Sequence, residues 1–203
     1  MFKSIFMLYK KRERFSRQSE ALGKYASKIP LSANNWTVLS IITAFITAFF
    51  IINNNFFFAA TFFAITAILD VIDGAVARHK KSASPKGAYI DTITDRYVEF
   101  IILGSLVFVS LPIVALNANA WIFLCILGGM MTTYAKSAAK EKELVKQELC
   151  GGLLERGERM ILLFLGLCVA TISLNYLVFI LILYAVLSNV TALQRIHSAL
   201  KTQ

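Results

Sequence analysis

The sequence predicts an all-α integral membrane protein with six transmembrane helices, preceded by an amphipathic helix at the membrane interface. The first observation is composition: 57% of the 203 residues are hydrophobic and 16% are charged, with a mean hydropathy of +0.65. Soluble domains are about 45–50% apolar. The second is that the apolar residues fall in long runs, and roughly 20 helical residues cross a bilayer core. We interpret residues 1–30 as a juxtamembrane segment and residues 31–203 as one six-span domain.

Residues 1–28 combine bulky apolar side chains with a high density of positive charge. Residues 1–30 contain eight Lys and Arg against two Glu, among apolar residues such as Phe2, Ile5 and Leu8. This mixture is typical of an amphipathic helix that lies in the plane of the membrane interface. A disordered basic tail is the alternative. Pro30 ends the segment, and Ser32 is a capping residue before the first span.

Six apolar runs follow, and we interpret each as one span. They cover roughly residues 36–53, 56–77, 88–110, 117–135, 159–174 and 176–194. The last two are nearly continuous, but a single helix of about 35 residues would reach about 50 Å, which is longer than the bilayer core is thick. The sequence therefore predicts a helical hairpin there, broken near residues 173–175.

The net charge of +9 is distributed in a way that indicates membrane topology. Basic residues concentrate in residues 1–30, after the second run, in residues 136–159 and at the C-terminus. The other connections, residues 53–55, 110–120 and 173–176, contain no charged residue. This alternation follows the positive-inside rule. We therefore expect a multi-pass protein of the cell membrane, with both termini and the charged loops in the cytoplasm, and no nucleic-acid partner.

Four aspartates lie within or beside the apolar runs: Asp70, Asp73, Asp91 and Asp95. An ionisable group in the bilayer costs roughly 2.5–3.5 kcal/mol, so it indicates a functional site. On helices, the first two lie about 60° apart and the last two about 40° apart, so each pair shares one face. The short connection makes these two spans antiparallel neighbours, and we expect the pairs to meet near the cytoplasmic end. Four carboxylates suit a hard cation, Mg²⁺ or Mn²⁺, with room for two ions.

Small and basic residues are interleaved with the aspartates. Gly74, Ala77 and Gly87 let a flat ligand or a backbone approach closely, and they also favour helix packing. Arg78 adds a positive group that can contact phosphate. A divalent-cation transporter is a second hypothesis, and a scaffold that binds anionic lipid through residues 1–28 is a third. The acids gather at one end of the spans, which disfavours transport, and the scaffold does not account for them.

The run D-x-x-D-G-x-x-A-R-x(8)-G-x-x-x-D-x-x-x-D extends without departure from Asp70 to Asp95. It resembles the signature of the CDP-alcohol phosphotransferases, integral membrane enzymes of phospholipid synthesis. The resemblance implies transfer from a CDP-linked lipid, carrying diacylglycerol or archaeol, to an alcohol, with release of CMP. It also implies a homodimer. An inactive member of the family is the alternative.

The resemblance also implies roles for the residues of the motif. Its metal ligands are Asp70, Asp73 and Asp91, with Asp95 a ligand, a general base or both. We assign the catalytic role to Asp95, because the base is expected to be the least tightly coordinated of the four acids. The CDP-binding residues would be Asp70, Asp73, Gly74, Ala77, Arg78 and Gly87.

Four basic residues at the ends of later spans indicate the acceptor: Lys136, Arg156, Arg159 and Arg195. We expect them to converge at the cytoplasmic mouth of the cavity and to bind the phosphate of a phosphorylated alcohol, since arginine binds phosphate through two donors. Alternatively, they extend to lipid headgroups or pair with Glu155 and Glu158. The Glu-Arg-x-Glu-Arg element resembles the sequence found in the branch of this family that uses inositol phosphate as the acceptor. Inositol 1-phosphate is therefore the predicted acceptor. Glycerol 3-phosphate is the alternative.

Overall fold

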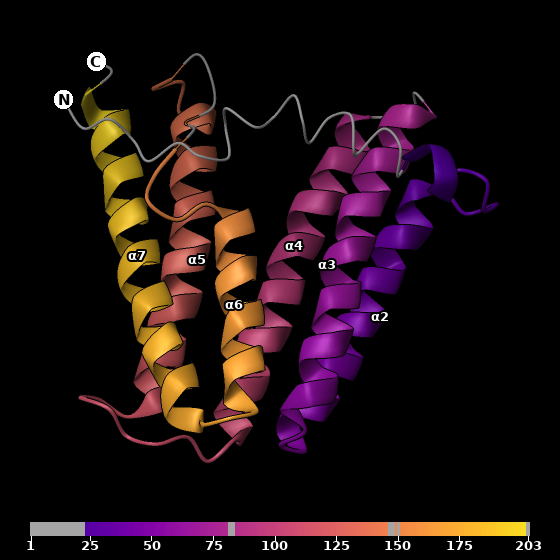
Figure 1. Cartoon of the computed structure of the whole chain (residues 1–203). Coiled ribbons are helices and arrows are strands. Elements are labelled where there is room, and N and C mark those ends of the chain that lie inside the picture. Colours follow the sequence, from indigo (N-terminus) through magenta and orange to yellow (C-terminus); the bar gives the residue numbers. More distant parts are fainter. Residues whose placement is uncertain (1–22, 81–83, 146–148, 150, 202–203) are drawn as a thin grey trace. The chain divides into compact units, whose positions relative to one another are not determined.

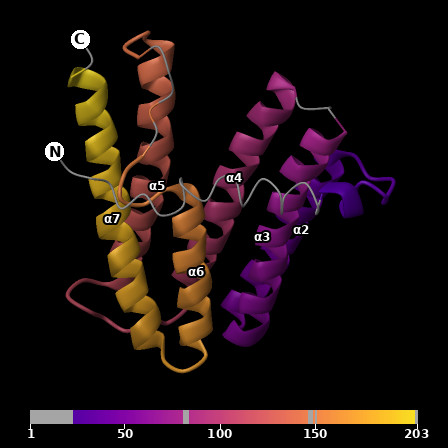
Figure 2. The same ribbon diagram turned by 45° about the horizontal axis from the view of Figure 1, so that its top comes forward.

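The computed structural model describes residues 23–80, 84–145, 149 and 151–201, and these are helical with short connections. The chain divides into two compact units, which we call the N-terminal half (Ile5–Ile102) and the C-terminal half (Leu103–Gln203). Figures 1 and 2 show the helices of both. They are α2 (Ala33–Ile52), α3 (Phe56–His79), α4 (Pro85–Ser105), the short 3-10 helix η2 (Leu106–Phe108), α5 (Ala118–Glu141), α6 (Arg156–Ala170) and α7 (Leu174–Lys201).

Each predicted apolar run corresponds to one of these α-helices. Within the described residues, α2, α3, α5 and α7 are long and apolar enough to cross a membrane. The protein is therefore an integral membrane protein that crosses the bilayer several times. Helix α6 has 15 residues, about 22 Å at 1.5 Å per residue, and α4 carries several charges, so six spans stay a prediction. Most of the predicted amphipathic segment, residues 1–22, lies outside the described residues.

In the N-terminal half, α2 and α3 pack side by side as a hairpin. The turn between them needs a left-handed residue, and Asn54 supplies it with φ of 58°, a conformation that Asn tolerates better than most residues. Asn55 then caps α3 by accepting a hydrogen bond from the Phe58 amide at 3.4 Å. The ring of Phe50 stacks on those of Phe58 and Phe62, which fixes the register of the hairpin.

A hydroxyl contact and an apolar cluster continue this packing along the helices. Thr66 of α3 donates to the hydroxyl of Thr43 of α2 at 2.9 Å. Further toward the end of α3, Trp36 and Val76 are buried in one cluster, packed against residues that include Leu69 and Ile72. In a membrane protein such close contacts supply much of the association between helices. They hold α2 against the part of α3 that carries the aspartates.

In the C-terminal half, α7 packs against both α5 and α6. Gly128 of α5 lies directly against the Ser188 side chain of α7, where a Cβ atom would collide. Next to this contact, Asn189 donates to the Leu124 carbonyl at 2.9 Å. Gly128 therefore serves close helix packing within the chain.

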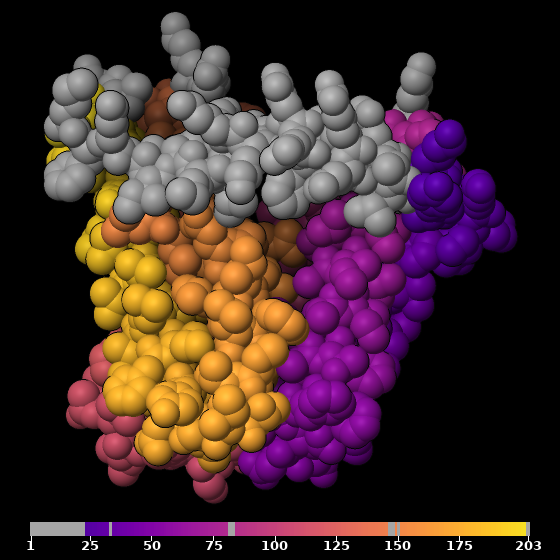
Figure 3. Space-filling view, viewed as in Figure 1, coloured from indigo at the N-terminus to yellow at the C-terminus, as the bar shows by residue number. Residues whose placement is uncertain are grey.

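Helices α6 and α7 form the predicted hairpin. A turn at residues 171–173 separates them, which confirms the break expected near residues 173–175. Gly166 permits the close approach, because its Cβ position lies 3.1 Å from a methyl group of Leu177. Side chains of the two helices meet along their length in the space-filling view (Figure 3).

Candidate active site

Three of the four predicted aspartates form one group in the N-terminal half. Asp70 of α3 and Asp91 and Asp95 of α4 each place a carboxylate oxygen within 4.8 Å of the others. Asp95 is the most enclosed, with 8% of its surface exposed. Like charges this close repel one another unless a cation lies between them. An all-oxygen set of this kind fits a hard divalent ion, so the three residues can hold a metal.

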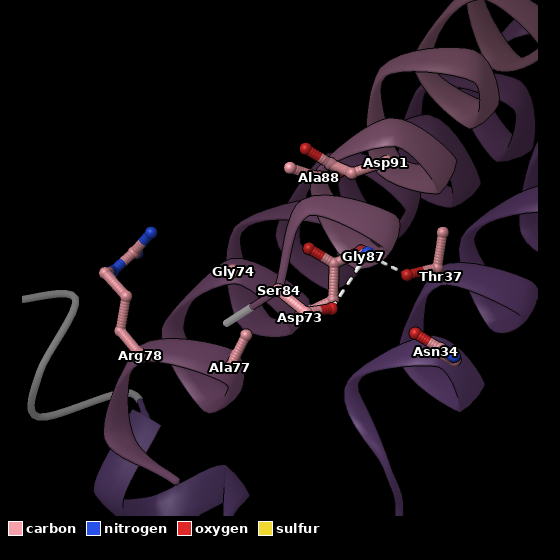
Figure 4. Close-up of a pocket in the computed structure, with 10 residues that line it drawn as sticks. All are labelled: Asn34, Thr37, Asp73, Gly74, Ala77, Arg78, Ser84, Gly87, Ala88 and Asp91. Carbon is pink, nitrogen blue, oxygen red and sulfur yellow. Dashed lines mark hydrogen bonds between the residues drawn. The ribbon is translucent and has the colours of Figure 1, made fainter. Parts of the chain in front are cut away.

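Asp73 lies one turn from Asp70 but has a different environment. It is 5% exposed, and one of its oxygens accepts a hydrogen bond from the Thr37 hydroxyl at 2.8 Å. Figure 4 shows the two side chains facing each other between α2 and α3. Asp73 is outside the group of three, so its role as a fourth metal ligand stays a prediction.

A pocket of about 200 Å³ opens beside Asp73 and Asp91. Its walls come from α2, α3 and the first turns of α4 (Figure 4). The lining residues are Asn34, Thr37, Asp73, Gly74, Ala77, Arg78, Ser84, Gly87, Ala88 and Asp91. Five of the six residues predicted to bind CDP are in this set, and Asp70 is the exception. The structure therefore brings most of the motif together around one cavity, and the group of three aspartates adjoins this cavity through Asp91.

The pocket wall combines missing side chains with positive charge. A Cβ atom on Gly74 would lie 3.2 Å from a guanidinium nitrogen of Arg78, so the glycine leaves room on that side of α3. Ser84 accepts a hydrogen bond from the Gly87 amide at 3.1 Å and so caps the start of α4. The N-terminus of a helix presents unpaired N–H groups and partial positive charge. This wall suits a phosphate group.

Four lining residues were not predicted: Asn34, Thr37, Ser84 and Ala88. Asn34 and Thr37 lie in the first turns of α2, directly after the capping residue Ser32. The sequence pattern there indicates a helix start and gives no sign that these residues also line a pocket. Ser84 followed by Pro85 is a recognisable helix start, and it could have located the N-terminus of α4 at the pocket. Ala88 has no signal of its own.

Helix α4 also carries a largely buried ion pair directly after Asp95, between Arg96 and Glu99. A guanidinium nitrogen of Arg96 lies 2.6 Å from a carboxylate oxygen of Glu99, and Glu99 is 4% exposed. Breaking such a pair leaves an uncompensated charge. These charged residues make α4 less apolar than the other long helices.

The four basic residues predicted to bind the acceptor lie in the C-terminal half. Arg159 is 2% exposed and donates to the Thr132 hydroxyl at 3.1 Å. Arg195 donates to the Thr132 carbonyl at 2.7 Å and to the Gly151 carbonyl at 3.1 Å. Lys136 follows Thr132 by one turn of α5, and Arg156 opens α6. Arg159 and Arg195 therefore form hydrogen bonds within the protein. The alternative interpretation of the sequence was that these side chains extend to lipid headgroups.

The two glutamates beside these arginines are engaged with the backbone. Glu158 accepts a hydrogen bond from the Glu155 amide at 2.8 Å, and Glu155 accepts one from the Gly151 amide at 3.0 Å. The pattern is a capping box at the start of α6. These carboxylates thus shape the start of α6.

Comparison with known proteins agrees with this arrangement. The family model of the CDP-alcohol phosphatidyltransferases matches residues 31–197. An archaetidylinositol phosphate synthase of Pyrococcus horikoshii is 28% identical over 199 residues, 96% of this chain and 97% of that protein. A phosphatidylinositol phosphate synthase of Corynebacterium glutamicum is 24% identical over 163 residues, 77% of this chain and 72% of that protein.

A solved structure shares the fold. The phosphatidylinositol phosphate synthase of Mycobacterium tuberculosis, crystallised with CDP-DAG bound, has a TM-score of 0.76 to this chain at 22% identity. The match covers 90% of this chain and 94% of that one. The family match covers residues 31–197, and the aspartate motif from Asp70 to Asp95 lies inside it. The chain therefore belongs to the CDP-alcohol phosphatidyltransferase family.

Proposed function

We propose that the protein transfers a phosphatidyl-type group from a CDP-linked lipid to a hydroxyl of inositol 1-phosphate and releases CMP. The observation that carries this proposal is the group of Asp70, Asp91 and Asp95 beside a pocket whose wall suits phosphate. Two further supports are family membership and the similarity, over nearly the full chain, to an archaetidylinositol phosphate synthase.

In this proposal the donor lies in the pocket of the N-terminal half. Arg78 and the first turn of α4 bind its diphosphate, and Gly74 and Gly87 leave space for it. Asp70, Asp91 and Asp95 hold a divalent ion, with Asp73 as a fourth ligand and two Mg²⁺ or Mn²⁺ ions as the expected complement. Bound metal neutralises the diphosphate and makes CMP a better leaving group.

The transfer step is an attack by the acceptor hydroxyl on the β-phosphorus of the donor. The acceptor oxygen forms a bond to the β-phosphorus. At the same time, the bond between the β-phosphorus and the oxygen that bridges the two phosphorus atoms breaks. The electron pair of the broken bond stays on that oxygen, which leaves as part of CMP. The hydroxyl proton passes to a carboxylate, and the proposed base is Asp95, the acid that is expected to be the least tightly coordinated of the four.

The basic residues of the C-terminal half are proposed to bind the phosphate of the acceptor. Lys136, Arg156 and Arg195 supply the positive charge that contacts the phosphate, whereas Arg159, the fourth residue of the predicted set, is buried. An anionic acceptor gains from such a cluster, because charge-assisted hydrogen bonds are the strong ones. A zwitterionic or cationic alcohol gains much less.

The remaining topology is also a proposal. We infer that α4 and α6 span the membrane with the other four helices, that both termini and the active site face the cytoplasm, and that the enzyme is a homodimer. The distribution of basic residues supports the orientation. Protease accessibility of tags placed at the two termini in sealed vesicles tests it, and crosslinking in the membrane tests the dimer.

Identification of the lipid product by mass spectrometry tests the function. The purified protein is incubated with Mg²⁺, inositol 1-phosphate and either CDP-diacylglycerol or CDP-archaeol. With at least one donor, we expect a lipid product whose mass is that of the transferred phosphatidyl or archaetidyl group plus inositol phosphate. A product only when glycerol 3-phosphate replaces inositol 1-phosphate would overturn the acceptor assignment.

A further inference from the structure

Arg159 differs from the other basic residues of the predicted acceptor site. A side chain that contacts a dissolved phosphate must be reachable from solvent, and Arg159 is 2% exposed. Its guanidinium is directed instead at the hydroxyl of Thr132, to which it donates at 3.1 Å. Arg159 is therefore placed to act on a neighbouring residue of the protein.

Thr132 bonds to two arginines from two different helices. It is completely buried, with 0% exposure. Its hydroxyl accepts from Arg159 of α6 and donates to the Gly129 carbonyl at 2.8 Å. Its main-chain carbonyl accepts from Arg195 of α7 at 2.7 Å. We call Thr132, Arg159 and Arg195 the threonine junction.

The orientation of Arg195 depends on this junction. Its guanidinium donates through two nitrogens, to the Thr132 carbonyl and to the Gly151 carbonyl at 3.1 Å. Two bonds to two fixed carbonyls define the plane of a rigid, planar group. The segment that carries Gly151 is itself tied to α7, because the Leu154 amide donates to the Thr191 hydroxyl at 2.9 Å.

The same junction adjoins a second basic group. Lys136 lies one turn after Thr132 on α5, so the two residues share a helix face. A change in the position of Thr132 would therefore move the carbonyl that holds Arg195 and the turn that carries Lys136. Rigid support of this kind matters, because a binding group displaced by about 1 Å loses much of its effect.

We propose that Thr132 and Arg159 are positioning residues of the acceptor-phosphate site, and that they hold Arg195 in its binding orientation without contacting the acceptor. This inference rests on the proposed function. The buried hydrogen bond between them is charge-assisted and therefore strong, and its loss removes one of the contacts that fix the position of Thr132, whose carbonyl Arg195 uses.

The first test replaces the threonine hydroxyl by a methyl group of similar size. Thr132→Val is expected to raise the KM for inositol 1-phosphate about tenfold, equivalent to about 1.4 kcal/mol, and to leave the KM for the CDP-lipid within about twofold. Thr132→Ser restores the hydroxyl and is expected to return the acceptor KM to near that of the wild type. Thr47→Val is the matched control, since Thr47 is also 0% exposed and its hydroxyl donates to the Thr43 carbonyl of its own helix.

The second test asks whether the two residues act through one path. Arg159→Lys keeps the charge but changes the donor geometry, and it is also expected to raise the acceptor KM with the CDP-lipid KM unchanged. Thr132→Val added to Arg159→Lys is then expected to have little further effect, because residues that share one interaction are not additive. Arg159→Lys keeps the proposal testable if Thr132→Val does not fold.

The outcomes separate this inference from the function on which it rests. If the wild type neither binds inositol 1-phosphate in titration calorimetry nor releases CMP with it, the proposed function fails and this inference fails with it. If the wild type is active and Thr132→Val matches it in every parameter, only this inference is overturned. Equal increases in the acceptor and donor KM values, or full additivity in the double variant, would likewise reject a positioning role.

Discussion

The hydroxyl of Thr37 donates a 2.8 Å hydrogen bond to a carboxylate oxygen of Asp73 and so joins α2 to α3 inside the pocket. The bond is buried on both sides, with Thr37 7% and Asp73 5% exposed. A carboxylate held at one oxygen presents the other in a fixed direction. Partners of this kind orient metal ligands, and their loss typically weakens metal binding about 10- to 100-fold.

Thr37→Val is therefore expected to raise the Mg²⁺ concentration for half-maximal CMP release by about tenfold. The same shift should appear without turnover, as a weaker stabilisation of the protein by Mg²⁺ in thermal melting. Thr37→Ser, which keeps the hydroxyl, should behave like the wild type. An unchanged Mg²⁺ dependence in Thr37→Val would mean that Asp73 does not bind metal or needs no orientation.

Asp95→Asn tests the assignment of the base. The amide cannot accept the acceptor's proton as a carboxylate does, so turnover is expected to fall at least about 100-fold. CDP-lipid binding, measured by titration calorimetry with Mg²⁺ present, should remain close to that of the wild type. Asp70→Asn is the comparison, because it should lose donor binding as well. Equal loss of binding in both variants would make Asp95 chiefly a metal ligand.

Gly74→Leu tests the donor pocket. Leucine at this position meets the Arg78 guanidinium at its Cβ atom and fills part of a cavity of about 200 Å³. The KM for the CDP-lipid is expected to rise at least about tenfold, since a bulky group displaces the phosphate-binding wall. Gly157→Leu adds the same side chain where nothing lies within 4 Å, and its donor KM should be unchanged. Equal donor KM values in the two variants would place the donor elsewhere.

Arg195→Ala tests the acceptor site. Hydrogen bonds from a charged group contribute about 1.5–3 kcal/mol, so the acceptor KM is expected to rise about 10- to 100-fold. The donor KM should change far less. Lys201→Ala removes a positive charge from the exposed end of the same helix and serves as the control for net charge. Similar increases in both KM values for Arg195→Ala would argue against a separate phosphate site.

The helices were predictable because their signals are local. Neighbouring residues are enough to identify the apolar runs, the turn at Asn54 and Asn55, and the break before α7. The clustering of Asp70 with Asp91 and Asp95 was also predictable, because helical spacing and one short connection bring them together. The motif itself defined most of the pocket.

The remaining features depend on contacts between residues far apart in the chain. The bond between Thr37 and Asp73 joins different helices, and no periodicity identifies which threonine of α2 makes it. Arg159 and Arg195 both looked like charges at span ends, yet one is buried on Thr132 and the other bonds to two carbonyls. The direction of a long side chain is set by tertiary packing, so the spacing of residues in the sequence does not predict it.

Acceptor-dependent CMP release tests the central claim most directly. The purified protein receives a CDP-lipid and Mg²⁺, with inositol 1-phosphate, free inositol, glycerol 3-phosphate or serine in parallel. We expect CMP only with inositol 1-phosphate, and no CMP from Asp91→Asn under the same conditions. CMP release with free inositol or serine at the rate seen with inositol 1-phosphate would contradict the proposed reaction. The absence of CMP release with every acceptor would also contradict it.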